Sequence, residues 1–128
     1  LEGQTAALDV LVNAGCDVNQ AEKRGYTPAC IAAQKGHLAA LGILVKAGCD
    51  VNQAEKDGYT PACIAAQKGH LAALGILVKA GCDVNQADDD GATPAFVAAE
   101  KGHLAALDVL VRAGCDVNQA EKDGYTPA

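Results

Sequence analysis

The sequence predicts an all-α solenoid of stacked helix-turn-helix units with projecting β-turn or hairpin loops. Three observations lead to this fold class. The chain of 128 residues repeats itself with a period of 33 residues. Each unit contains two short helical patterns, each ended by glycine. Neither helix is long enough to be stable alone in water, so each must bury its apolar face against a neighbouring unit.

The repeat divides the single predicted domain, residues 1–128, into partial and full units. The first two full units differ only where Arg24 corresponds to Asp57, whereas the third carries nine substitutions relative to the second. The register gives a partial unit with the second helix and linker at 1–21, full units at 22–54, 55–87 and 88–120, and the start of a further unit at 121–128.

Composition excludes several classes of function. Net charge is -6 and only 3% of the residues are aromatic, so no basic surface for nucleic acid is expected. No apolar run approaches the ~18 residues of a membrane span, and no signal peptide is visible. The small residues at regular spacing suit thin, closely packed layers. We therefore expect neither nucleic acid nor membrane as a partner.

Six cysteines recur in register: Cys16, Cys49, Cys82 and Cys115 at one position of the unit, Cys30 and Cys63 at another. Equivalent positions in stacked helices lie roughly 8–10 Å apart, whereas disulfides need Cα atoms within about 7 Å. No Cys-x-x-Cys spacing suggests a metal site. We interpret all six as small buried residues and free thiols. Free thiols favour a reducing, intracellular and cytoplasmic location.

Each unit is expected to begin with a turn and a short helix. Asp17–Tyr26 is polar, and Asp57-Gly58 in the next unit is a signal for a tight turn. Thr27 is placed to cap a helix that starts at Pro28 and continues over Ala29–Lys35. Gly36 ends this helix because glycine readily takes the left-handed conformation.

The second helix of the unit is predicted over Leu38–Ala47. Its apolar face is expected to contain Leu38, Leu41, Leu44 and Val45, and Gly48 ends it. Gly42 and Gly75 lie inside this helix in the first two full units, where glycine either permits close packing or is simply tolerated.

At this level of detail the chain resembles the ankyrin repeat family. The segment DGYTPACIAAQKGHLAALGILVKAGCDVN, Asp57–Asn85, carries the family's Asp-Gly-x-Thr-Pro, Gly-His and Ala-Gly-x-Asp-Val-Asn motifs in register. The resemblance covers nearly the whole chain. It implies antiparallel helix pairs in an L-shaped, slightly curved array, turns that project to one side, and a non-enzymatic role in protein binding.

The chain departs from the family where Thr-Pro is usually followed by Leu-His. Cys30, Cys63 and Phe96 occupy the position of that histidine. The family's histidine makes a structural hydrogen bond near the turn, so we expect this bond to be missing and an apolar contact to replace it. Phe96 is the single phenylalanine and should give the third full unit a different packing.

The remaining candidates for chemistry are better explained as framework. His37, His70 and His103 match the family's structural histidine, which ties neighbouring loops by hydrogen bonds. The acidic cluster 88–90 lacks the ligand spacing of an EF-hand and is interpreted as a solvated turn in preference to a weak cation site. No phosphate loop, nucleophile elbow or pair of catalytic acids is present. We expect no catalytic activity, cofactor or metal.

The positions that vary between units are the candidates for specificity. The resemblance implies that partners contact the turns and the inner face of the first helix. On this chain those positions are Lys23, Arg24, Tyr26, Gln34, Lys35, Lys56, Asp57, Tyr59, Gln67, Lys68, Asp89, Asp90, Ala92, Glu100, Lys101, Lys122, Asp123 and Tyr125.

Two features of this predicted surface stay open at the level of sequence. Tyr26, Tyr59 and Tyr125 occupy one turn position, where tyrosine either anchors a partner or packs over its own turn. The turn charge changes from Lys23-Arg24 through Lys56-Asp57 to Asp89-Asp90. This gradient either orients a partner or is accidental.

The leading functional hypothesis is a non-catalytic protein-binding module with a concave surface and an unidentified protein partner. The near identity of two units supports an alternative: a structural, engineered or truncated repeat scaffold without a specific partner. Neither end of the pattern carries a clear polar cap, so this scaffold would self-associate head to tail.

Overall fold

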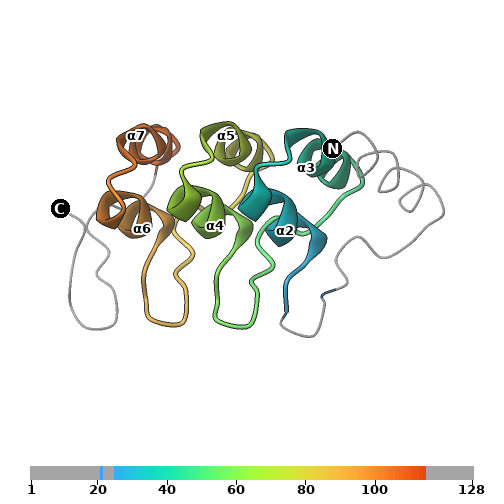
Figure 1. Cartoon of the computed structure of the whole chain (residues 1–128), viewed down its shortest axis with the longest axis horizontal. Helices are drawn as coiled ribbons and strands as arrows, with labels where there is room; N and C mark the ends of the chain where they lie inside the picture. The colour runs from blue at the N-terminus through green and yellow to red at the C-terminus, as the bar shows by residue number, and fades with distance from the viewer. Residues whose placement is uncertain (1–20, 22–24, 115–128) are drawn as a thin grey trace.

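A computed structural model describes residues 21 and 25–114 (Figure 1). The described chain contains six helices, which form three antiparallel pairs in chain order. Their bounds are α2 Pro28–Lys35, α3 Leu38–Lys46, α4 Pro61–Lys68, α5 Leu71–Lys79, α6 Pro94–Glu100 and α7 Leu104–Arg112.

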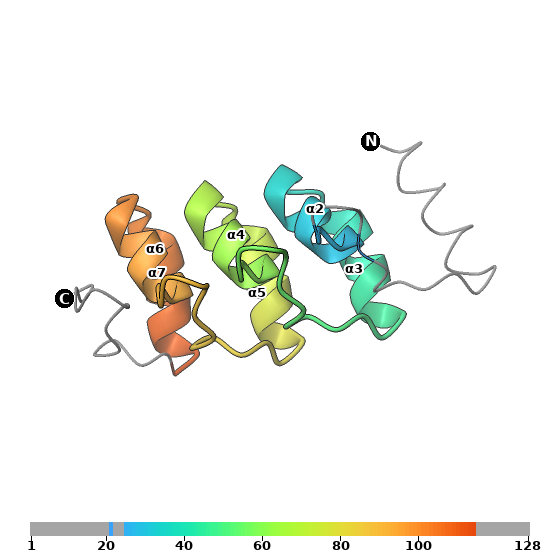
Figure 2. The ribbon, with the colours of Figure 1, turned by 90° about the horizontal axis from the view of Figure 1, so that it is seen from below.

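The helices form two rows, and the turns project from one side of them. The first helices of the units, α2, α4 and α6, pack in sequence against one another. The second helices, α3, α5 and α7, form the other row, and Figure 2 shows the same order from below. The all-α solenoid predicted from the repeat is therefore confirmed.

Each first helix begins with a capping threonine that is followed by a proline. The Thr27 hydroxyl accepts a hydrogen bond from the Cys30 backbone N–H at 3.2 Å, and Pro28 occupies the first turn. Gly36 ends the helix with φ of 68°. Since threonine satisfies a free N–H and proline has none to lose, this local sequence starts a helix before any tertiary contact forms.

The second helix, α3, also begins where predicted and ends one residue earlier, because Ala47 is its cap. Its predicted apolar face is wrong at Leu38, which is 42% exposed, whereas Leu41 and Leu44 are fully buried. At 3.6 residues per turn, each three-residue step rotates the side chain by about 60°. The buried arc is centred near Leu41 and Leu44, so Leu38 falls outside it.

The core consists mainly of small residues from the first helices and leucines from the second. Ala29, Cys30 and Ala33 of α2 are buried, as are Leu41 and Leu44 of α3. Phe96, Val97 and Ala92 form a separate buried cluster in the third unit. The expected difference in the packing of that unit is thus present.

Each described turn is closed by backbone hydrogen bonds. Glu55 N–H donates to the Tyr59 carbonyl at 2.9 Å, and Gly58 N–H donates to the Glu55 carbonyl at 3.0 Å. Gly58 has φ of 88°. The predicted turns are present, and no strand is assigned within residues 25–114.

The two mid-helix glycines are not required for close packing. A Cβ atom added at Gly42 or Gly75 would have no heavy atom within 4 Å from outside the helix's own local backbone. Of the two explanations open from the sequence, close packing is therefore excluded.

We predict that Gly42→Ala and Gly75→Ala each raise the free energy of unfolding by about 0.5–1 kcal/mol, because alanine restricts the unfolded chain and favours the helix. Urea denaturation of the single variants and the double variant measures this. Gly58→Ala is the control and should destabilise, because its Cβ would lie 2.6 Å from the Asp89 backbone nitrogen. Unchanged or lower stability of Gly42→Ala would contradict the prediction.

Candidate functional site

Two of the three histidines join neighbouring units. The Nε2 atom of His70 lies 3.0 Å from the Gln34 carbonyl oxygen, and that of His103 lies 3.0 Å from the Gln67 carbonyl oxygen. The ring of His70 also packs close to Gly36. The structural role that the family resemblance implied is confirmed for these two residues, which are therefore poor candidates for catalysis.

The thiols at the family's usual histidine position keep a polar contact across the unit. Cys30 Sγ donates to the Gln53 carbonyl at 3.8 Å, and Cys63 Sγ donates to the Gln86 carbonyl at 3.9 Å. The expectation that an apolar contact alone replaces the histidine's bond is therefore wrong at these two positions. A thiol is a weak donor with a large sulfur atom, so its bond to the linker backbone is long.

In the two turns that the structure describes in full, the first acidic residue organises the turn backbone. Oε1 of Glu55 accepts hydrogen bonds from the backbone N–H groups of Asp57 at 2.7 Å and Tyr59 at 2.9 Å. Oδ1 of Asp88 accepts from Asp90 and Ala92, both at 2.9 Å.

These two carboxylates are only 6% and 9% exposed. The interpretation of the acidic cluster 88–90 as a solvated turn is therefore wrong for Asp88. Within the acidic cluster 88–90, Asp89 and Asp90 are exposed.

The linkers also bond from unit to unit. Oδ1 of Asn52 accepts a hydrogen bond from the Asp83 backbone N–H at 2.7 Å, and Gln86 Nε2 donates to the Asn52 carbonyl at 3.2 Å. Sequence reasoning gave no such role to Asn52, Gln86, Glu55 or Asp88. Their recurrence in register, which identified the histidines as framework, would have identified them too.

Little reactive chemistry remains in the part of the chain that the structure describes. No group of three histidine, cysteine or acidic side chains in that part is arranged to hold a metal ion. The four described cysteines are free thiols. Cys30 and Cys63 are buried as predicted, whereas the prediction of burial is wrong for Cys49 and Cys82, which are partly exposed. Cys16 and Cys115 lie outside the described residues. None of the described helices is long and apolar enough to cross a membrane.

The predicted binding positions that the structure describes lie on the turns and first helices. Tyr26, Tyr59 and Gln67 are half-buried, and Ala92 is 6% exposed and offers little contact area. Lys23, Arg24, Lys122, Asp123 and Tyr125 lie outside the described residues. The exposed positions are Gln34, Lys35, Lys56, Asp57, Lys68, Asp89, Asp90, Glu100 and Lys101.

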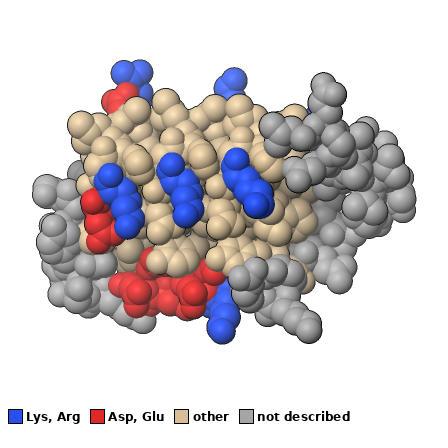
Figure 3. All heavy atoms as spheres, in the orientation of Figure 1, with Lys and Arg blue, Asp and Glu red and all other residues tan. Residues whose placement is uncertain are grey.

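The charges on this face are ordered. Figure 3 shows basic side chains in a row across the first helices and acidic side chains gathered over the turns. The row corresponds to Lys35, Lys68 and Lys101, at or next to the ends of α2, α4 and α6. A partner that crosses the face from helix ends to turns would therefore meet opposite charges in a fixed order.

Tyr26 and Tyr59 are half-buried and pack against the core cluster. Burial raises the pKa of Tyr59, and the carboxylates of Asp88 and Asp90 raise it further. This packing favours the interpretation that each tyrosine ring covers its own unit. Part of each tyrosine stays exposed and is accessible to a partner.

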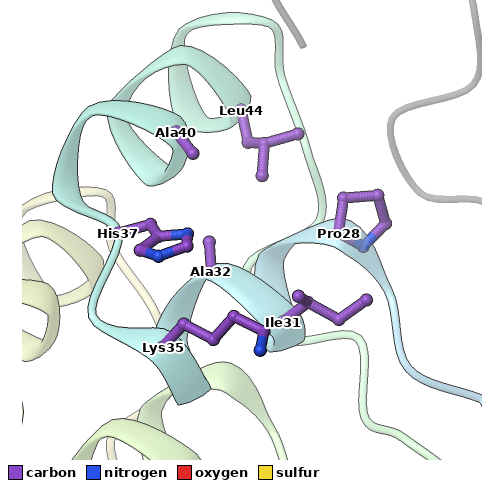
Figure 4. A pocket seen from close by; sticks show the side chains of 7 residues that line it. All are labelled: Pro28, Ile31, Ala32, Lys35, His37, Ala40 and Leu44. Atoms are coloured by element: carbon purple, nitrogen blue, oxygen red, sulfur yellow. The ribbon is translucent and has the colours of Figure 1, made fainter. Parts of the chain in front are cut away.

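A hollow lies on the side of α2 that faces away from α4. It has a volume of about 280 Å³ and is lined by Pro28, Ile31, Ala32, Lys35, His37, Ala40 and Leu44 (Figure 4). Ile31 is 37% exposed, whereas the equivalent Ile64 and Val97 are each 5% exposed. Since α2 packs on α4 and α4 packs on α6, this hollow is the stacking surface of a unit.

The comparisons with known proteins agree with this geometry. Residues 1–88 match the family described as ankyrin repeats (3 copies), and residues 77–128 match ankyrin repeats (many copies). A comparison with curated protein sequences found no match. The chain belongs to the ankyrin repeat family, whose members are typically protein-binding modules and usually non-catalytic.

The buried thiols predict a fall in stability at alkaline pH. Burial raises the pKa of Cys63 to about 12 from its usual value of 9.0. Below pH 9 this thiol is protonated in both states. Between pH 9 and 12 the unfolded chain loses the proton first, so stability falls by up to about 1.4 kcal/mol per pH unit.

We expect Cys63→Ala to flatten this slope. Urea denaturation of both proteins at pH 8, 9.5 and 10.5 measures it, and the other thiols, lysines and tyrosines contribute equally to the two curves. Parallel curves would contradict the assigned pKa shift.

Proposed function

We propose that this protein is a non-catalytic module that binds a protein partner through the face formed by its turns and first helices. One observation carries the proposal. The bonded histidines, the two turn carboxylates and the linker amide of Asn52 are occupied by bonds within and between units. The exposed side chains of this face, in contrast, are ordered in charge. Such a surface is rigid before binding, so a partner loses little affinity to ordering of the module.

The free thiols support a reducing compartment as the working environment, in keeping with the cytoplasmic location expected from the sequence. Non-catalytic binding also fits the bonded histidines, because a ring held between units is not free to move protons. The proposal includes a concave shape for this surface, as expected from the sequence.

The chain offers a matched test of the face. Lys35 and Lys68 end the first helices, and Lys46 and Lys79 end the second helices of the same units. All four are exposed and occupy the last turn. Reversing either pair changes net charge and helix-end electrostatics in the same way.

We predict that Lys35→Glu/Lys68→Glu weakens binding at least about fivefold, whereas Lys46→Glu/Lys79→Glu leaves it unchanged. A protein captured by the immobilised wild-type chain is purified, and its affinity for each variant is measured by calorimetry. Equal affinity for all three proteins, or loss in the second pair alone, would show that the face is wrongly assigned.

A scaffold that self-associates is the second candidate, and the exposure of Ile31 favours it. The hollow of Figure 4 is equivalent to the surface of α4 that α2 covers, so a unit from a second copy has the matching shape. Stacking of this kind is heterologous and open-ended.

Light scattering over a concentration series tests the scaffold hypothesis. We expect the average mass of the wild type to rise with concentration and Ile31→Glu to remain monomeric, because a charge in the stacking face must lose its water. A wild type that stays monomeric throughout would exclude head-to-tail association.

A further inference from the structure

A hollow of about 250 Å³ separates Tyr59 of the second unit from α6 of the third. Ala92 and Phe96 lie at its apolar side, and Asp88, Asp90 and Glu100 contribute carboxylates. Its volume is below the 300–1,000 Å³ that is typical of sites for small-molecule ligands. The space therefore suits a single side chain.

The substitutions that distinguish the third unit are concentrated here. Of the nine positions at which residues 88–120 differ from 55–87, five line this hollow: Asp88, Ala92, Phe96, Val97 and Glu100. Two others form the exposed pair Asp108–Arg112 at 3.1 Å on α7. The divergence of an otherwise uniform repeat therefore coincides with one concave feature.

One substitution opens the hollow. Ala92 stands where the second unit has Tyr59 and the first has Tyr26. The exchange removes an aromatic ring from the turn of the third unit. The Tyr59 side chain of the neighbouring turn consequently borders open space.

The other substitutions make the surroundings more negative. Glu100 replaces the neutral Gln67, and Asp89, in the turn beside the hollow, replaces the positive Lys56. Lys101 also lines the hollow, so three carboxylates face one ammonium group. Figure 3 shows acidic side chains gathered over the turns at this side of the array.

We propose that the hollow between Tyr59 and α6 is a specificity pocket for one basic side chain, arginine or lysine, of the protein partner. This inference rests on the proposed binding function and names the chemistry of the partner. The cation would lie against the Tyr59 ring, where aromatic faces attract positive charge, with Asp90 and Glu100 as its counter-ions.

The probe is an acetylated and amidated pentapeptide, Gly-Gly-Arg-Gly-Gly, titrated into the isotopically labelled full chain and followed by NMR. We expect the arginine peptide to shift the backbone signals of residues 59, 90–92 and 100–101. The same peptide with glutamate in place of arginine should leave them unmoved. Equal shifts with both peptides, or shifts confined to other residues, would overturn the pocket.

Two variants restore residues that the chain already uses in its second unit. Ala92→Tyr refills the hollow and is expected to abolish the shifts. Glu100→Gln removes one counter-ion and should weaken binding about threefold to tenfold. Gln34→Glu is the control, because it adds a carboxylate at the equivalent position of α2 and should not alter the shifts at residues 90–92.

Glu100 is exposed, so Glu100→Gln should fold and still tests the proposal if Ala92→Tyr does not fold. Wild-type affinity in a folded Ala92→Tyr or in Glu100→Gln would overturn the proposal.

Capture of a protein partner distinguishes a failure of the pocket from a failure of the proposed binding function. Capture that depends on Lys35 and Lys68 but not on Ala92→Tyr would exclude the pocket and retain the binding face. Specific arginine binding without any protein capture would support the pocket and exclude that function.

Discussion

Contact between neighbouring units is the constraint on which the rest of this structure depends. Helices of seven to nine residues do not persist alone in water, so each must bury one face on the next unit. Small residues such as Ala33 and Ala66 let the first helices approach closely, and the leucines of the second helices fill the remaining space. The stability of the array is then approximately the sum of the stabilities of its units and of the interfaces between them. No single core organises the fold.

This constraint explains why so many chemically versatile side chains are unavailable for catalysis. His70 and His103 bridge loops, Glu55 and Asp88 hold turns closed, and Asn52 joins linkers. Each bond satisfies backbone groups that would otherwise be left unpaired where units meet. What remains accessible is a face of exposed charges, which suits recognition.

The third unit shows how a uniform array acquires a local difference. Its framework residues Thr93, Pro94 and His103 repeat those of the other units, and its two helices begin at the same positions of the repeat. Only the end of α6 differs, one residue earlier in register than the ends of α2 and α4. The substitutions instead gather around one hollow beside Tyr59. Phe96 replaces a thiol within a separate small cluster, so the larger side chain is accommodated without disturbing the main core. Val97 keeps an apolar, buried side chain at the position where the second unit has Ile64, so the variation preserves the contact between units.

The sequence by itself determined the repeat, the helix start at Thr27-Pro28 and the end of that helix at Gly36, because capping and positive φ are local properties of the chain. Recurrence in register also predicted a framework role for the histidines, which is confirmed for His70 and His103. Only the tertiary structure decided that Leu38 is exposed, that Cys30 bonds to a linker carbonyl, that Glu55 and Asp88 are buried, and that Ala92 lines a hollow beside Tyr59. These outcomes depend on how a neighbouring unit covers each side chain, and contacts between units are not encoded in the pattern of any one of them.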